Sequence, residues 1–129
     1  MKKILIVVVA LLVTAIIFIM PVTFLMVKQG FLHQDKTWAP GLVYSGARVR
    51  MRLQQYRTAA TILTKAVDVF PSYKNTDKAY FWIALCHEKN KSPKQAVQWY
   101  QQFLQRWPDH DWSAQAQARV DKLKVQFEL

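Results

Sequence analysis

The sequence predicts an all-α protein: an N-terminal transmembrane helix, two antiparallel helix pairs and a C-terminal capping helix. Three observations carry this prediction. The chain begins with a long apolar run, and beyond it no stretch shows the sustained period-2 alternation typical of a strand. It also repeats itself at a spacing of 37 residues, the signature of stacked helix pairs. The repeated residues are Ala59, Leu63, Ala66 and Pro71, followed by Ala96, Tyr100, Phe103 and Pro108.

Residues 1–28 are expected to form a transmembrane signal anchor. The run from Ile4 to Val27 holds 24 uncharged residues after Lys2 and Lys3. As a helix it measures roughly 36 Å, more than the roughly 30 Å of a bilayer's hydrocarbon core. A cleaved signal peptide is the alternative, but the small-x-small sequence 13–15 is followed by more apolar residues. We therefore expect the segment to remain uncleaved.

The charges next to the apolar run bear on its orientation. Lys2, Lys3 and the terminal amine precede the run, whereas Lys28 and Lys36 follow it. This count, with the signal-like start, favours a cytoplasmic amino terminus. We expect a single-pass protein of the inner (plasma) membrane whose C-terminal domain is periplasmic or otherwise extracytoplasmic. Cys86 is the only cysteine, which excludes an intrachain disulfide.

A formal charge of +10 at pH 7 narrows the classes of partner. An excess of this size favours acidic proteins, anionic lipid headgroups or nucleic acid. The alternative is a solvated basic surface beside a membrane. Composition leaves both open.

The domain after the anchor is expected to begin with a linker and one helix pair. Residues 29–41, with Gly30, Pro40 and Gly41, have the composition of a juxtamembrane linker. The helical domain then spans 42–129, and its first pair spans about 42–71. Local signals between Tyr44 and Phe70 would permit one helix of about 25 residues. Aligning Ala59 with Ala96 instead places a break at residues 53–55.

The second pair, about 77–108, is more clearly bounded. Asn75 or Thr76 can cap its first helix, and residues 90–92 form the turn. Ser92 followed by Pro93 is typical of a helix start, since proline at the first position lacks an N–H that has no partner there anyway. A capping helix, about 111–127, follows with Asp111 as its expected N-cap.

These residues resemble the tetratricopeptide repeat family over about residues 42–125. The resemblance rests in the second unit on Tyr80, Ile83, Ala84, His87, Ala96, Tyr100 and Pro108. In the first unit it rests on Ala47, Leu53, Tyr56, Ala59, Leu63, Ala66 and Pro71. Residues 79–123 are also similar to the repeats of envelope proteins, such as outer-membrane assembly lipoproteins and the partner of the Tol-Pal system.

The resemblance implies a binding groove lined by the first helix of each unit. Carried onto this sequence, the groove residues are Tyr44, Arg48, Met51, Arg52, Lys78, Phe81, Leu85 and Glu88. Arginines and aromatic rings suit an extended or helical peptide with acidic residues, because guanidinium groups pair with carboxylates in a bidentate manner. Scattered, solvated cations are the alternative interpretation of the same residues.

Catalytic, metal and cofactor sites are not expected. His33, His87 and His110 show no ligand spacing to one another or to Cys86, and no glycine-rich phosphate loop or serine elbow is present. Tryptophans 82, 107 and 112 are interpreted as packing residues. Trp99 is expected to face solvent or a partner, because Tyr100 occupies the packing stripe.

The sequence thus predicts a non-enzymatic, membrane-anchored scaffold that binds a protein in a cell-envelope complex, either as a peptide or as another membrane subunit. A basic surface-binding protein for anionic lipid or nucleic acid is the alternative, with nucleic acid the less favoured ligand. Two repeats are fewer than the roughly three that usually bury a continuous core. Self-association is therefore a further possibility.

Overall fold

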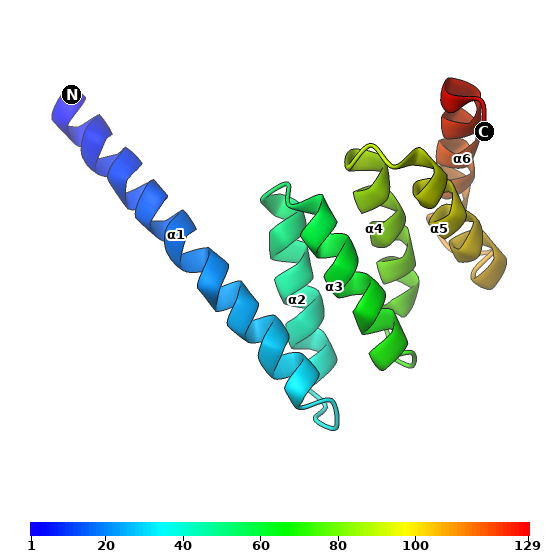
Figure 1. Ribbon diagram of the computed structural model, residues 1–129, viewed down its shortest axis with the longest axis horizontal. Helices are drawn as coiled ribbons and strands as arrows, with labels where there is room; N and C mark the ends of the chain where they lie inside the picture. The colour runs from blue at the N-terminus through cyan, green and yellow to red at the C-terminus, as the bar shows by residue number, and fades with distance from the viewer.

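The computed structural model describes residues 1–129 and contains six helices and no strand (Figure 1). They are α1 (Lys2–Leu32), α2 (Ala39–Arg52), α3 (Tyr56–Val69), α4 (Thr76–Lys89), α5 (Pro93–Arg106) and α6 (Ser113–Phe127). Each helix packs against the next along the chain, while the first half of α1 projects away from the row (Figure 1). The predicted all-α class, a long apolar helix followed by two pairs and a capping helix, is confirmed.

The expected break lies at residues 53–55, between α2 and α3. Gln54 adopts the left-handed conformation there, with φ of 60°. Lys91, 37 residues later, does the same with φ of 58°. In both turns the next amide donates a hydrogen bond to the carbonyl five residues back, at 2.9 Å for Gln55 and 2.8 Å for Ser92. The duplication is therefore present in the backbone and not only in the alanine and proline pattern.

The second half of α1 belongs to an additional, incomplete repeat unit. In the three remaining turns an amide donates to the carbonyl three residues back, at Lys36 (3.0 Å), Tyr73 (3.2 Å) and His110 (3.2 Å). These positions are again 37 residues apart. The same spacing makes residues 19–32 equivalent to α3 and α5. Thr23 in this segment is buried, 3% exposed.

Close contact between α1 and α2 depends on two glycines. A Cβ atom on Gly30 would overlap Val43 and lie 3.0 Å from the carbonyl oxygen of Ala39. A Cβ atom on Gly46 would lie 2.6 Å from Cγ2 of Val27. Since real Cβ atoms essentially never come so close, only glycine allows these two backbones to approach. The glycines let residues 20–32 act as a packed helix of the domain.

The predicted linker, residues 29–41, is mostly helical, and this expectation has to be corrected. Residues 29–32 end α1, residues 39–41 begin α2, and only residues 33–38 connect them. Gly30 was interpreted as a loop residue, but its role is the close contact with Val43. Pro40 lies in the first turn of α2, where a missing N–H leaves no bond unmade.

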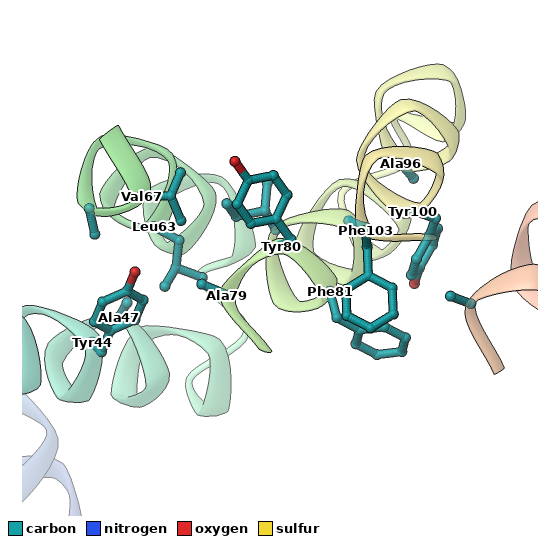
Figure 2. Close-up of a cluster of buried hydrophobic side chains, with 14 of the residues drawn as sticks. Tyr44, Ala47, Leu63, Val67, Ala79, Tyr80, Phe81, Ala96, Tyr100 and Phe103 are labelled. Atoms are coloured by element: carbon teal, nitrogen blue, oxygen red, sulfur yellow. The ribbon is translucent and has the colours of Figure 1, made fainter. Parts of the chain in front are cut away.

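The core is continuous from α2 to α6 and contains 20 buried residues. Neighbouring helices approach each other closely at alanines, whose side chains are small. Ala47, Ala84 and Ala96 have no exposed surface. Aromatic rings fill the remaining space, with Phe81 edge-on to Tyr100 and Phe103 at centroid distances of 5.3 and 5.7 Å. Figure 2 shows these rings gathered between α4 and α5. Burial of this apolar surface is the main force that holds the helices together.

The helix starts agree with the sequence at α5 but not at α6. Ser92 precedes α5 and Pro93 is its first residue, although the serine side chain makes no capping hydrogen bond. Helix α6 begins at Ser113 with Trp112 at the N-cap, so the assignment of that role to Asp111 is wrong. The turn is instead closed by Ser113, whose hydroxyl donates to the carbonyl of Trp107 at 2.7 Å.

Candidate functional site

Side chains from α2, α4 and the start of α6 meet on one surface. The guanidinium of Arg48 lies 5.4 Å from the ring centroid of Trp82. Trp82 in turn lies 6.4 Å from the ring of Trp112, and the Lys78 ammonium lies 5.9 Å from that same ring. We call these four residues the cationic-aromatic face. They link cation and aromatic surface across three helices, as a ligand that carries carboxylates and apolar groups would require.

Two of the eight predicted groove residues belong to this face, and three more are at least partly exposed. Arg48 and Lys78 belong to it, and Arg52 is exposed at the end of α2. Met51 and Leu85 are half-buried.

Tyr44 and Phe81 were also predicted to line the groove, and this has to be corrected. They are only 3% and 6% exposed. Tyr44 stacks on Tyr73 at 4.9 Å between ring centroids, and Phe81 lies within the ring cluster of α5. Both rings therefore support the surface from beneath and cannot contact a ligand.

Glu88, the remaining predicted groove residue, is already bound within the domain. Its Oε2 accepts hydrogen bonds from the Tyr100 hydroxyl and from Nη1 of Arg119, each at 2.8 Å. Burial raises the pKa of Tyr100, and the hydrogen bond to Glu88 acts in the same direction, so the hydroxyl remains a donor at neutral pH. The interaction joins α4, α5 and α6 and removes one negative charge from the surface available to a ligand.

Trp82 and Trp112 were predicted to be packing residues, and both do pack against the core. Their additional place on the cationic-aromatic face was not predicted. Each is half-buried and carries a cation on its ring. A signal was available: Trp82 lies four residues after Lys78, so both fall on one side of a helix. Trp99, expected to face solvent or a partner, is half-buried and edge-on to Tyr80 at 5.3 Å.

The largest cleft, about 630 Å³, lies elsewhere, between α3, α4 and α5. Its lining includes Tyr56, Lys65, Cys86, His87 and Trp99. Burial lowers the pKa of His87 and raises the pKa of the Cys86 thiol to about 12. A neutral imidazole beside a protonated thiol supplies no charged nucleophile. We therefore take the cationic-aromatic face, rather than the cleft, as the candidate binding site.

Cys86 should be unreactive in the folded protein. Its side chain has no exposed surface, and a thiol with a pKa of about 12 contains almost no thiolate at pH 8. We expect Ellman's reagent to leave the native chain unlabelled and to titrate one thiol after denaturation. Rapid labelling of the native chain would show that the α3–α4 contact opens.

Sequence comparison agrees with the fold of paired helices. The family model for the tetratricopeptide repeat matches residues 44–111, which include α3, α4, α5 and the larger part of α2. No relative was found among the curated proteins. The matched segment is more than half of the chain, and its repeated turns and alanine-lined contacts are those of the fold. The chain therefore belongs to the tetratricopeptide repeat family.

Proposed function

We propose that this protein is a membrane-anchored scaffold that binds an acidic segment of another protein on its cationic-aromatic face. The observation that carries the proposal is the alignment of Arg48, Trp82, Trp112 and Lys78 across three helices. Tetratricopeptide repeats typically serve protein–protein interaction rather than catalysis, and we propose no enzymatic activity. Surface aromatic and arginine side chains are also the residue types that dominate binding energy at protein interfaces.

The partner is proposed to be an extended or helical peptide, or a subunit of the same membrane complex. One cation lies against each ring of the tryptophan pair, which favours a ligand with carboxylates beside an apolar group. Glu88 does not oppose such a ligand, since Arg119 already neutralises it. The cell-envelope setting and the extracytoplasmic position of the domain are parts of this proposal that come from the sequence.

Membrane anchoring by the first half of α1 is supported by side chains beyond any cleavage site. Val22, Phe24 and Leu25 are 55%, 61% and 56% exposed. Cleavage after Ala15 would leave these apolar side chains in water, whereas an uncleaved helix can bury them in lipid. The packed second half of α1 also supplies burial that two repeats lack, so self-association is not needed for stability.

A double variant that reverses one charge of the cationic-aromatic face and removes one of its rings tests the binding site. Arg48→Glu with Trp82→Ala should weaken partner binding by about 30-fold or more, because truncation of a central tryptophan alone costs about 2 kcal/mol at such sites. The measurement is copurification of crosslinked partners from membranes, followed by titration with the partner identified. Lys74→Gln with Lys122→Gln, which changes two exposed lysines outside the face, is the matched control and should bind normally.

Salt separates this proposal from a basic surface that holds lipid or nucleic acid. Charge-driven binding should collapse when salt rises from about 50 to about 200 mM, whereas a peptide packed on tryptophan should lose far less. If binding collapses and both double variants weaken it equally, the scaffold proposal is wrong.

A further inference from the structure

Charge is divided unevenly between the two edges of the helical row. The turns at 53–55 and 90–92 lie at one edge, together with the C-terminal end of α6 (Figure 1). Six exposed cations lie within about a turn of the helix ends there, and we call them the basic edge: Arg52, Arg57, Lys89, Lys91, Lys94 and Lys124.

The opposite edge carries most of the negative charge. It contains the turns at 33–38, 70–75 and 107–112, and five of the eight acidic residues lie in or next to them: Asp35, Asp68, Asp77, Asp109 and Asp111. Of the other three, Glu88 is paired with Arg119, Asp121 accepts a hydrogen bond from Gln117, and the exposed Glu128 at the end of α6 offsets one of the six cations of the basic edge. The domain therefore presents a positive edge and an edge of mixed charge.

The first half of α1, up to about residue 18, projects from the domain at the basic edge, and we call it the free half. Residue 19 is equivalent to residues 56 and 93, which follow the two turns of this edge, and Figure 1 shows α1 projecting from the same side. Arg50 fixes this geometry: Nη1 donates to Sδ of Met20 at 2.8 Å and Nη2 donates to its carbonyl at 3.2 Å. The end of α2 is thus tied to the point where α1 becomes free.

The free half of α1 is so short that the basic edge must lie close to the bilayer. Residues 4–18 measure roughly 22 Å as a helix, short of a hydrocarbon core of roughly 30 Å. About 20 residues are needed to cross it, which extends the lipid-covered part to about Thr23. The exposure of Val22 and Phe24 agrees with this depth. Met20 and its partner Arg50 then lie close to the boundary between hydrocarbon and headgroups.

We propose that the basic edge binds the headgroups of anionic phospholipids in the bilayer that holds α1. This inference rests on the proposed membrane anchor. Each lysine or arginine near an anionic surface contributes about 1 kcal/mol, or about a fivefold change in equilibrium, within a Debye length. Contact at this edge restricts the orientation of the domain relative to the membrane, and with it the orientation of the cationic-aromatic face.

The test uses the full chain in nanodiscs and measures how close each edge lies to the lipid surface. A fluorophore is attached at Asn90→Cys in the basic edge, or at Ser72→Cys in the opposite turn as the matched control. Both positions are exposed, and the native Cys86 is buried. Nitroxide-labelled headgroups quench a fluorophore that touches the surface. The nanodiscs contain either phosphatidylcholine alone or phosphatidylcholine with phosphatidylglycerol.

We expect strong quenching at position 90 in the anionic nanodiscs, weaker quenching in phosphatidylcholine alone, and little at position 72 in either. Lys91→Gln with Lys94→Gln should lower the ratio of docked to undocked domain about 25-fold. Lys36→Gln with Lys74→Gln, which removes the same charge from the other edge, should leave it unchanged.

Equal quenching at positions 90 and 72, or quenching at 90 that is independent of lipid charge and of the lysines, would overturn the proposal. Tight binding of a single-stranded RNA probe, without binding to phosphatidylglycerol, would also overturn the proposal. The edge would then be a surface that binds nucleic acid. If the chain does not insert into nanodiscs at all, the proposed membrane anchor is wrong. Incorporation with no docking would leave the anchor and the scaffold intact.

Discussion

Phe103→Ala should lower the free energy of unfolding by about 3–5 kcal/mol, the range for truncation of a fully buried phenylalanine. The Phe103 side chain has no exposed surface. Its ring lies 5.7 Å from Phe81, 5.9 Å from Trp107 and 5.0 Å from His110 between centroids. The substitution therefore leaves a cavity where α4, α5 and the α5–α6 turn meet. Denaturant unfolding of the full chain in micelles, followed by circular dichroism, measures the loss.

Phe127→Ala provides the control for this prediction. Phe127 ends α6 and is 47% exposed, so its truncation should change the stability by no more than about 0.5 kcal/mol. If the two phenylalanine variants lose equal stability, the ring cluster between α4 and α5 is not the centre of the core.

Gly30→Ala should destabilise the contact between α1 and α2 by about 1–3 kcal/mol, the usual cost of overpacking. The new Cβ atom would overlap Val43 and lie 3.0 Å from the backbone oxygen of Ala39, which cannot move without shifting α2. We expect residues 20–32 to separate from α2 while α3 to α6 remain folded. Faster hydrogen exchange confined to residues 20–52 is the measurement that checks this.

Gly41→Ala is the matched control, because it makes the same chemical change in the next helix. The added Cβ atom would lie 3.6 Å from the Tyr73 hydroxyl, an ordinary contact. An alanine inside a helix is better than glycine by about 0.5–1 kcal/mol, so Gly41→Ala should be neutral or stabilising. Identical behaviour of the two variants would mean that α1 does not pack closely on α2.

The repeat could be predicted from sequence because close helix packing requires small residues at fixed positions, and prolines follow the helix ends. Ala59 and Ala96 lie at helix contacts where a larger side chain would not fit, and Pro71 and Pro108 follow helix ends. The break at residues 53–55 contains no glycine or proline and was found only through the 37-residue spacing. Gln54 and Lys91 adopt the left-handed conformation at equivalent positions without the glycine that usually marks it.

The incomplete repeat in α1 could not be found in this way. Val22 and Gln34 stand where the other units have alanine and proline, so the pattern is absent. The almost uniformly apolar sequence of α1 also conceals the periodicity of a helix that is packed on one side only. Gly30, the residue that allows the contact, has the appearance of a loop residue in sequence.

The candidate face was predicted in part, and the errors have a common cause. Assigning residues to a groove by family position does not show how far each ring is buried, and Tyr44 and Phe81 lie beneath neighbouring rings. Trp82 was correctly assigned to packing. Its contact with Arg48 could not be predicted, because Arg48 comes from another repeat and the contact is made only by tertiary structure.

Site-specific photocrosslinking in native membranes tests most directly whether this protein works by holding another. A benzoylphenylalanine is placed at Leu85, which is half-buried on α4 and falls on the same side of that helix as Lys78 and Trp82 by its spacing, or at Gln98, which is exposed on α5. We expect one discrete adduct from position 85 and none from position 98. The adduct from position 85 should disappear in the double variant Arg48→Glu with Trp82→Ala. Adducts from position 98 alone, or equal and diffuse adducts from both, would contradict the scaffold proposal.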